Sequence, residues 1–483
     1  MNAADNAPRV IWAVQNGSSA GNMLRSGVLA RVLDSVPDAR VTLMSQLVAD
    51  PAFTAEFAHA RVSFEPLAPH APRGLEARLL GVIQARYLEA RTTDTLRIKL
   101  AAGHPGTRIR LRRLQALAGR ALAPHADAGR WYEIADRLIP DAGAESVFDR
   151  YQPTLLIVAT PGLGFPEIPL IRTAARRRVP TMAIDLSWDN LTNKLFPIRK
   201  VDRLVVWNST LRREAQELHG YEPEAIDVAG APQFDRYFNG EPRSSRVEFC
   251  RRVGLDPSRR IVTLTTIPTD SFPRHDLVVD ALLEAMRGGA IAEPCDVLVR
   301  VHPREDLRRY DRFIGVPHVA VEKPFRATVA SPDGHGVDVT SDNTRHLADT
   351  MHHSDVVLNV ASTIAIEAAI FDTPVVNIAF DPESIERPFL QSPLRYYSYT
   401  HYARIVHAGA ARLASSAREM IDLVNAYLAD RSLDAPGRQR VVQEQCEFTD
   451  GRSAERVALA ITRQITSGAG VAVGAPGWNR RAS

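Results

Sequence analysis

The stretch "PTLLIVATPGLGFPEIPLIRTAARRRVPTMAID" (residues 153–185) decides the fold class. Residues 154–159 are an apolar run typical of a buried strand, and a turn rich in glycine and proline leads from them into a helical pattern that begins at about Glu167. Residues 180–185 are a second apolar run. A strand, a helix and another strand in this order predict a βαβ unit, in which the two strands are parallel.

The same alternation recurs on both sides of this stretch. Residues 9–14 predict a strand, and a loop of small residues joins it to a helix; the small residues are Gly17, Ser18, Ser19 and Gly21. Further strands are predicted at 203–207 and 225–228, with a helix capped by Asn208 or Ser209 between them. After a polar connection at 239–249, a second series of strands and helices begins. The chain is therefore predicted to be an α/β protein with two Rossmann-like halves.

These patterns give the expected domain boundaries. We expect an N-terminal Rossmann-like domain at 8–238, with a mostly helical insertion at about 75–145, where the strand–helix rhythm breaks. A C-terminal Rossmann-like domain is expected at 245–430, followed by helices at 431–466. The glycine-rich end, residues 467–483, is predicted to be a disordered tail.

Composition narrows the class of protein. A chain of 483 residues is too long for one core, and 45% hydrophobic with 24% charged residues is an ordinary globular composition. Lys and Arg number 59 against 56 Asp and Glu, a net charge of +3, which gives no reason to expect a nucleic-acid partner. The three cysteines, Cys250, Cys295 and Cys446, are far apart, so neither a disulfide framework nor a zinc site is predicted.

The sequence also bears on cellular location. The opening "MNAADNAPRVIWAV" lacks a signal-peptide pattern, and no segment approaches the roughly 20 apolar residues that a membrane span needs. We expect a cytoplasmic protein. The segment "RIRLRRLQALAGRAL" (residues 108–122) could be a basic amphipathic helix on the inner face of an anionic membrane, or a helix with an ordinary solvated face. Both interpretations stay open.

Three short stretches follow predicted strands at the edge where ligands of open parallel sheets bind. They are "NGSSAGN" at 16–22, "RVHPRE" at 300–305 and the stretch at 359–376. In the third, Ser362 and Thr363 fall at a helix start, where their hydroxyls and the amides after them could hold a phosphate oxygen. Glu367 follows one turn later and could accept hydrogen bonds from ribose hydroxyls. No DxD cluster or group of histidines predicts a metal.

These motifs together resemble the GT-B glycosyltransferases, in particular the CDP-glycerol glycerophosphotransferases and the bacterial sialyl- and Kdo-transferases. His302 and Pro303 match the HP motif that faces the donor phosphate, and Ser362 and Thr363 match the serine motif opposite it. "DVAGAPQFD" at 227–235 is similar to the segment before the hinge, and "DGRSAERVALAI" at 450–461 to the closing helix. The resemblance implies two Rossmann-like domains that face each other across a cleft.

Site roles follow from this resemblance. The expected donor-binding residues are Arg300, His302, Pro303, Ser362, Thr363 and Glu367, and the small-residue loop Gly17, Ser18, Ser19 and Gly21 is expected to bind acceptor or phosphate. His302 would also act in catalysis. In "DLSWDNLTNK" (185–194) Asp189 is the candidate base for the acceptor hydroxyl. The alternative is that Asp189 and Asn190 form a turn over Trp188.

The expected function is transfer of a glycosyl or glycerophosphoryl group from a nucleotide-activated donor, a nucleotide sugar or a CDP-alcohol. The acceptor would be a cell-surface polysaccharide or a lipid-linked glycan, and neither a cofactor nor a metal would take part. Two alternatives remain. A UDP-GlcNAc 2-epimerase-like enzyme would share the fold, although the epimerase pattern has a Gly pair after the serine where this chain has Thr363 and Ile364. A non-catalytic GT-B scaffold would keep the binding sites alone.

Overall fold

We analysed a computed structural model of the chain. It describes residues 7–81, 93–103, 117, 133–134, 136–194, 199–241, 243–324, 326–327, 337–383 and 385–468. Most of the expected insertion, almost all of the basic segment 108–122 and nearly the whole expected tail lie outside these ranges. The chain divides into two compact units: Met1–Asp235, Thr328–Gly336 and Arg452–Ser483 form the first, and Arg236–Ala327 with Val337–Gly451 the second.

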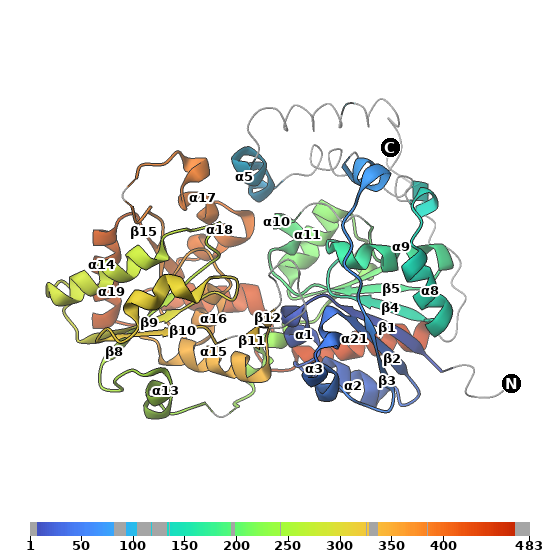
Figure 1. Ribbon diagram of the computed structural model, residues 1–483, viewed down its shortest axis with the longest axis horizontal. Coiled ribbons are helices and arrows are strands. Elements are labelled where there is room, and N and C mark those ends of the chain that lie inside the picture. Colours follow the sequence, from blue (N-terminus) through green and yellow to red (C-terminus); the bar gives the residue numbers. More distant parts are fainter. Residues whose placement is uncertain are drawn as a thin grey trace. The chain divides into compact units, whose positions relative to one another are not determined.

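The first unit is built on a seven-stranded parallel sheet (Figure 1). Its strands, in the order β3-β2-β1-β4-β5-β6-β7, are β1 Arg9–Val14, β2 Arg40–Ser45, β3 Val62–Pro66, β4 Leu155–Val158, β5 Thr181–Ile184, β6 Arg203–Val206 and β7 Ile226–Val228. The central strands β1, β4 and β5 are buried almost along their whole length, which is why they read as continuous apolar runs. The predicted doubly wound parallel sheet is confirmed.

The helices of this unit alternate with its strands. They are α1 Gly17–Met23, α2 Val28–Ser35, α3 Pro51–Glu56, α5 Asp94–Gly103, α8 Ala142–Tyr151, α9 Ile168–Arg177, α10 Asn190–Asn193, α11 Ser209–His219 and α21 Ser453–Gly468, with 3-10 turns at Gln46–Ala49, Phe165–Glu167, Pro223–Ala225 and Pro232–Phe234. The last helix, α21, buries its apolar face in the same core as β1, β2 and α2. The Asp235 carboxylate accepts hydrogen bonds from the N–H groups of Ser453 (2.8 Å) and Ala454 (2.7 Å), so it caps the start of α21.

The prediction of a loop at Gly17–Gly21 is wrong. These residues form helix α1, and the Asn16 side chain caps it by accepting a hydrogen bond from the Ser19 N–H (3.0 Å). A turn at 24–27 then separates α1 from α2, with Gly27 in the left-handed region (φ 86°), where a predicted single helix would have continued. Small residues and an N-cap residue occur in loops and in helix starts alike, so the sequence pattern did not separate the two.

The second unit is built on a six-stranded parallel sheet. Its strands, in the order β10-β9-β8-β13-β14-β15, are β8 Arg260–Thr265, β9 Cys295–Arg300, β10 Val319–Glu322, β13 Val356–Asn359, β14 Val375–Ile378 and β15 Ala411–Ala414. Two short strands, β11 Arg326–Ala327 and β12 Val337–Asp338, pair antiparallel. The second series of strands predicted from the sequence corresponds to β8, β9, β10, β13 and β14. It does not include β15, an edge strand of four residues whose centre is only partly buried.

The helices of the second unit are α13 Arg246–Val253, α14 His275–Arg287, α15 Ser341–His353, α16 Ile364–Ile370, α17 Leu394–Tyr397, α18 Thr400–His407, α19 Ala417–Ala429 and α20 Ala435–Val441. The 3-10 turns Leu307–Phe313 and Phe389–Gln391 and a π-helical turn at Val442–Cys446 complete it, and the four-residue α12 (Asp235–Phe238) lies at the division between the units. The expected polar connection at 239–249 is helical from Arg246 onward, because Ser245 and Glu248 form a capping box.

Gly437 lies where α20 packs closely against the backbone at Gly409. A Cβ atom built at this position would overlap with the backbone carbonyl group of Gly409, which cannot move away as a flexible side chain can. We expect Gly437→Ala to lower the free energy of unfolding by about 1–3 kcal/mol. Gly143→Ala in α8 is the matched control, since a Cβ there would meet no atom within 4 Å, and it should stabilise by up to about 1 kcal/mol. Chemical denaturation measures both, and equal midpoints for the two variants would contradict the expectation.

Candidate functional site

The HP loop begins where strand β9 ends in the second unit. Arg300 is the last residue of β9, and the backbone N–H of His302 donates a hydrogen bond to Thr266 Oγ1 (2.8 Å) just beyond the neighbouring strand β8. The register pairs Thr265 of β8 with Arg300 of β9. The side chain of His302 is half-buried at this edge of the sheet. Its position is thus fixed by two strands rather than by a free loop.

A hydrogen bond to the imidazole ring of His302 identifies its neutral tautomer. Its Nδ1 atom accepts a hydrogen bond from the Arg304 N–H (3.1 Å), so the ring proton of the neutral imidazole lies on Nε2. Burial, with the nearby charges of Arg304 and Lys323, lowers the pKa of His302 to about 4. At neutral pH the imidazole is therefore uncharged and presents an Nε2–H donor.

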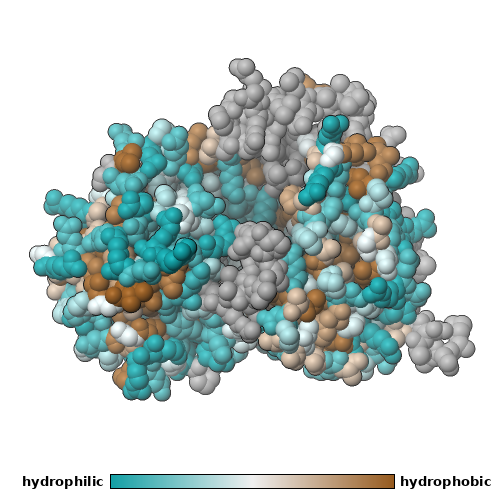
Figure 2. All heavy atoms as spheres, in the orientation of Figure 1, coloured by the Kyte–Doolittle hydropathy of each residue, from teal (hydrophilic) through white to brown (hydrophobic). Residues whose placement is uncertain are grey.

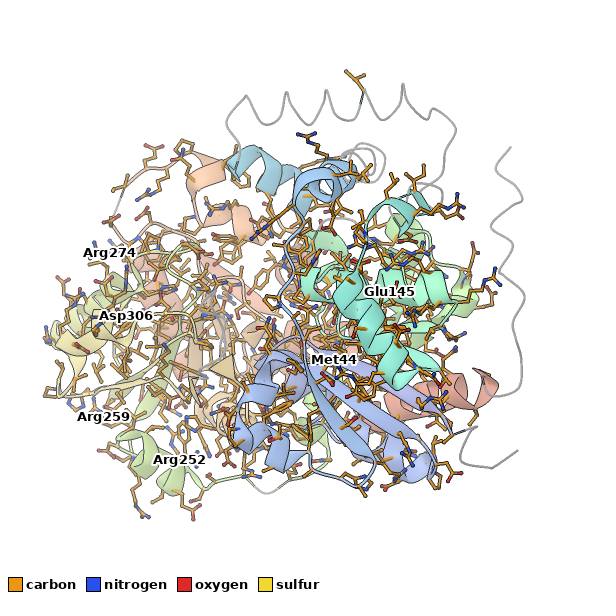
Figure 3. All side chains as sticks on the ribbon, turned by 45° about the vertical axis from the view of Figure 1, so that its right-hand side comes forward. Met44, Glu145, Arg252, Arg259, Arg274 and Asp306 are labelled. Carbon is orange, nitrogen blue, oxygen red and sulfur yellow. The ribbon has the colours of Figure 1, made fainter. Side chains whose placement is uncertain are left out.

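Residues after the HP dipeptide hold the loop in place. The buried Glu305 accepts hydrogen bonds from Tyr310 (2.8 Å) and Thr269, and its carbonyl oxygen accepts one from the Lys323 ammonium (2.6 Å). Asp306 then caps the following 3-10 turn and lies on the second unit in Figure 3. This second layer of contacts was not visible in the sequence, because Lys323 lies 18 residues beyond Glu305.

The Ser-Thr motif lies at the same edge of the same sheet. Strand β13 ends at Asn359, and Ala361 then adopts a left-handed conformation (φ 39°) that is uncommon for alanine. Ser362 and Thr363 follow, half-buried, immediately before α16. Only β8 separates β13 from β9, which puts the backbones after these two strands roughly 10 Å apart. The structure therefore brings His302, Pro303, Ser362 and Thr363 to one edge of the second sheet.

Arg300 and Glu367 are buried near this edge, Arg300 as the last residue of β9 and Glu367 in the first turn of α16. The Arg300 guanidinium is buried and pairs with Glu322 (2.7 Å), which also contacts His346 (2.6 Å). The buried Glu367 carboxylate accepts a hydrogen bond from the Tyr237 hydroxyl (2.9 Å), and burial raises the pKa of Glu367 to about 7. Both side chains thus have partners inside the second unit, and their role in donor binding stays a prediction.

In the first unit the structure identifies a buried carboxylate that the sequence analysis missed. Glu167 is buried and accepts hydrogen bonds from the Ala159 N–H and the Thr160 hydroxyl, both at 2.7 Å. Thr160 Oγ1 in turn accepts one from the Gly164 N–H (2.9 Å). Burial raises the pKa of Glu167 to about 7. The loop after β4 is therefore fixed at the edge of the first sheet, next to the loop after β5.

The loop after β5 carries the candidate base. Asp189 accepts hydrogen bonds from the Ser187 hydroxyl at Oδ1 and from the Asn193 amide at Oδ2. Both oxygens thus take part in a local turn, while Trp188 is buried beside it. This geometry agrees with the turn interpretation, and a catalytic role of Asp189 stays a prediction. Asp185, which directly follows β5, is the other carboxyl group of this loop.

In the ranges that the structure describes, no group of three or more His, Cys, Asp and Glu side chains could hold a metal ion. No described helix combines the length and the apolarity that crossing a bilayer requires. On the face shown in Figure 2 hydrophilic residues cover most of the described surface, with smaller hydrophobic patches between them.

More than half of the chain matches a known protein family. Residues 173–463 match the model of the family "CDP-Glycerol:Poly(glycerophosphate) glycerophosphotransferase", a stretch of more than half the chain. The chain belongs to this family. The match includes the β5 loop of the first unit and both motifs of the second, whereas α1, with its small residues, lies outside it. Family membership thus confirms the resemblance inferred from the HP and Ser-Thr motifs.

Individual relatives are distant. A lipid-A-disaccharide synthase from Geobacter sulfurreducens is 26% identical over 270 residues, which are 52% of this chain and 60% of that protein. A putative UDP-N-acetylglucosamine 2-epimerase from Listeria monocytogenes superimposes with a TM-score of 0.54 at 11% identity, over 95% of this chain and 97% of that one. The epimerase from Neisseria meningitidis gives 0.52 at 10% identity, over 95% and 100%. At such low identity these structures show the fold alone, and they confirm the predicted α/β GT-B class.

Proposed function

We propose that this protein transfers a glycosyl or glycerophosphoryl group from a nucleotide-activated donor to a hydroxyl group of a cell-surface glycan or its lipid-linked precursor. The observation that carries the proposal is the Nε2–H donor of His302, which lies at the edge of the sheet that also carries Ser362 and Thr363. The match of residues 173–463 to a glycerophosphotransferase family supports the same reaction class. The family is named for CDP-glycerol, which favours a cytidine diphosphate donor.

The donor phosphates bind at the second sheet in this proposal. A neutral imidazole is suited to the task, because it can donate a hydrogen bond to a phosphate oxygen without titrating near neutral pH. Charge builds up on the nucleotide phosphate as its bond to the transferred group breaks, and a fixed donor aimed at that charge lowers the barrier. The hydroxyls of Ser362 and Thr363 complete the phosphate contacts. We propose that the reaction needs neither a metal nor another cofactor.

The acceptor binds at the first unit, where the loops after β4 and β5 end the strands of the first sheet. We propose a glycan or lipid-linked acceptor, because the family acts on a poly(glycerophosphate) chain. A protein that works on such an acceptor operates at the inner face of the cell membrane. Peripheral contact with this surface is therefore part of the proposal.

Nucleotide binding gives the first test. We expect CMP and CDP to raise the melting temperature of the protein more than UDP or GDP do. A nucleotide at a hundred times its dissociation constant adds roughly 2.7 kcal/mol to the free energy of unfolding, which corresponds to several degrees for a unit of this size. Differential scanning fluorimetry without added metal, and again with EDTA, measures the shift and its dependence on metal.

The outcomes separate the candidate functions. Transfer from CDP-glycerol to a cell-envelope acceptor extract would support the proposal, and stabilisation by UDP alone would replace the cytidine donor with a uridine one. Epimerisation of UDP-GlcNAc without an acceptor would favour the alternative enzyme. Stabilisation without any turnover in a panel of donors would instead indicate a binding scaffold.

A further inference from the structure

Asp185 occupies an unusual position in the loop after β5. It directly follows the last residue of that strand, and only 1% of the residue is exposed. Its Oδ1 atom accepts hydrogen bonds from the Asn190 amide and from the Ser187 N–H (3.3 Å). Asn190 is the first residue of α10, so this short helix is tied back to the end of the strand.

The same loop holds three buried oxygen atoms that accept no hydrogen bond from any described residue. They are Asp185 Oδ2, Asn190 Oδ1 and Asn193 Oδ1. Nearly all buried polar atoms in folded proteins have a partner, and each exception costs roughly 1–3 kcal/mol. All three atoms are acceptors, and Asn190 and Asn193 lie three residues apart, on the same face of α10. Each of them needs a hydrogen-bond donor that the described residues do not supply.

Hydroxyl groups are the donors that fit such a set. Each hydroxyl can donate one hydrogen bond, and a polyol or sugar offers several at neighbouring carbons. Asp189, by contrast, has both oxygens bonded to Ser187 and Asn193 and would have to give up one of these bonds first. In the loop after β5, both oxygens of Asp189 therefore take part in the turn, whereas Oδ2 of Asp185 accepts no hydrogen bond from a described residue.

We propose that Asp185, Asn190 and Asn193 form the subsite for the acceptor's hydroxyl groups and that Asp185 takes the proton of the attacking hydroxyl. This inference rests on the proposed function and assigns the proton acceptor to Asp185 in place of Asp189. Because only 1% of Asp185 is exposed, the loop after β5 has to move before a hydroxyl group or a bridging water molecule reaches the carboxylate.

The O–H bond of the acceptor breaks and its proton moves to Asp185 Oδ2. The acceptor oxygen forms a bond to the transferred centre, which is an anomeric carbon or a phosphorus atom. The bond from that centre to the nucleotide phosphate oxygen breaks, and its electron pair leaves with the nucleotide. Asp185 later returns the proton to water.

The surroundings of Asp185 suit a proton acceptor at neutral pH. The pKa of Asp185 is raised to about 7, mainly by burial and to a smaller extent by the negative charge of Asp189. The Asn190 amide, the Ser187 N–H and the charge of Lys194 act in the opposite direction. Tyr221 lies close enough for the charge of Asp185 to raise the tyrosine pKa. A base whose pKa is near the working pH combines a deprotonated state with a useful affinity for the proton.

The test compares Asp185→Asn with Asp189→Asn. We expect D185N to lower kcat for transfer about 10²- to 10⁴-fold with little change in the donor KM, whereas D189N lowers kcat less than tenfold. Asp149→Asn, an Asp-to-Asn change at an exposed position of α8, is the matched control and should keep the wild-type rate. Stabilisation by CDP should be equal in all three variants, because the nucleotide binds at the second unit.

A measurement on the unmodified protein covers the case in which D185N does not fold. The wild-type kcat should rise about tenfold per pH unit below pH 7 and level off above it, since the base must be deprotonated. Glu167 and Glu367 also have a pKa raised to about 7, so the profile is repeated with Glu367→Gln and Glu167→Gln, which should both retain the step. Asp185→Glu should retain it with a shifted midpoint.

The outcomes distinguish this inference from the proposed function. A loss in D189N as large as that in D185N, or a flat pH profile in the active wild type, would overturn the assignment of Asp185 and leave the proposed function standing. A wild-type protein that binds no nucleotide and transfers no group would overturn the proposed function, and the role of Asp185 with it.

Discussion

His302→Ala is expected to lower kcat for group transfer by about 10²- to 10³-fold, the usual effect of removing one fixed hydrogen-bond donor from a developing anion. The expected loss in the free energy of unfolding is only about 1 kcal/mol, because the side chain is half-buried and its Nδ1 atom accepts a single backbone hydrogen bond. The anchoring bond to Thr266 uses the backbone N–H, which alanine retains.

Two variants sharpen this comparison. His407→Ala, at an exposed position of α18, removes a histidine from the same unit and should leave both the rate and the stability near their wild-type values. His302→Gln places an amide donor near the position of Nε2 and should recover part of the rate. Steady-state kinetics and chemical denaturation measure the two quantities, and parallel losses of rate and stability in H302A would show that the imidazole acts only in packing.

The pH dependence separates a hydrogen-bond donor from a general acid or base. With a pKa lowered to about 4, His302 stays neutral throughout the neutral range, so its contribution to kcat should be constant between pH 6 and 9. H302A should therefore lower the whole profile by the same factor and leave the step near pH 7 in place. A change in the position of that step would assign the titration to His302 instead.

The sequence predicted most of the fold because buried parallel strands leave a strong trace. The runs at 9–14 and 154–159 are apolar almost throughout, as strands covered on both faces must be. The errors lie where one pattern serves two structures. Asn16 followed by small residues suits both a phosphate loop and the capped helix α1, and the short edge strand β15 has too few buried residues to give a periodic signal.

The candidate site was predictable only as far as topology determines it. The carboxyl ends of β9 and β13 meet at one edge of any such sheet, so the proximity of His302 and Ser362 followed from the order of elements. Hydrogen bonding does not follow from order. The sequence does not reveal that Asn193 occupies an oxygen of Asp189, or that Asp185 is buried with an oxygen left over, because both depend on how the nine residues after β5 fold back on the sheet.

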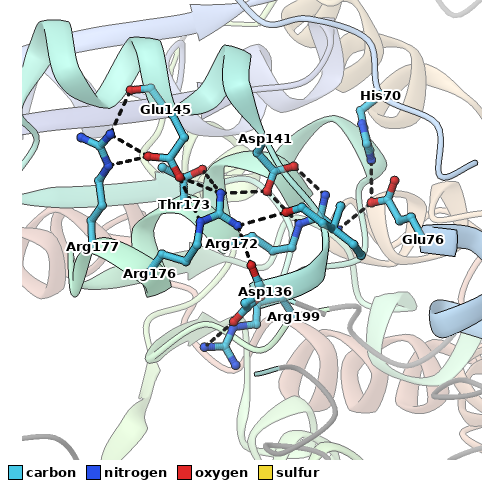
Figure 4. A network of polar contacts seen from close by, with 11 residues as sticks. His70, Glu76, Asp136, Asp141, Glu145, Arg172, Thr173, Arg176, Arg177 and Arg199 are labelled. Carbon is cyan, nitrogen blue, oxygen red and sulfur yellow. Dashed lines mark hydrogen bonds and ion pairs between the residues drawn. The ribbon is translucent and has the colours of Figure 1, made fainter. Parts of the chain in front are cut away.

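Arg172→Met is expected to lower the free energy of unfolding by about 3–5 kcal/mol, the second of the large effects. Arg172 lies on α9 and is only 2% exposed. It donates two hydrogen bonds to Asp141 (2.6 and 3.0 Å) and one to Glu76 (2.6 Å), both of which are buried (Figure 4). Methionine would fill much of the volume but would leave two buried carboxylates without their main partner.

The network of Arg172, Glu76 and Asp141 joins segments that lie far apart in the sequence. Glu76 lies in the helical segment at 74–81, and Asp141 directly precedes α8, so Arg172 joins both flanks of the expected insertion to α9. Arg176 and Arg177 extend the network to Glu145 on α8, but these pairs are more exposed. Arg177→Met is therefore the matched control, with an expected cost below about 1 kcal/mol.

A compensating variant tests the physical reason for the loss. If the cost of R172M comes from uncompensated buried charge, neutralising the partners in the triple variant R172M/E76Q/D141N should recover at least half of the lost stability, although three ionic contacts are then missing. If the cost comes from lost attraction or packing, the triple variant should be less stable than R172M. Urea denaturation of the wild type, R177M, R172M and the triple variant decides between these explanations. Adding E76Q and D141N to R172M should raise the free energy of unfolding if buried charge causes the loss, and lower it if lost contacts cause it.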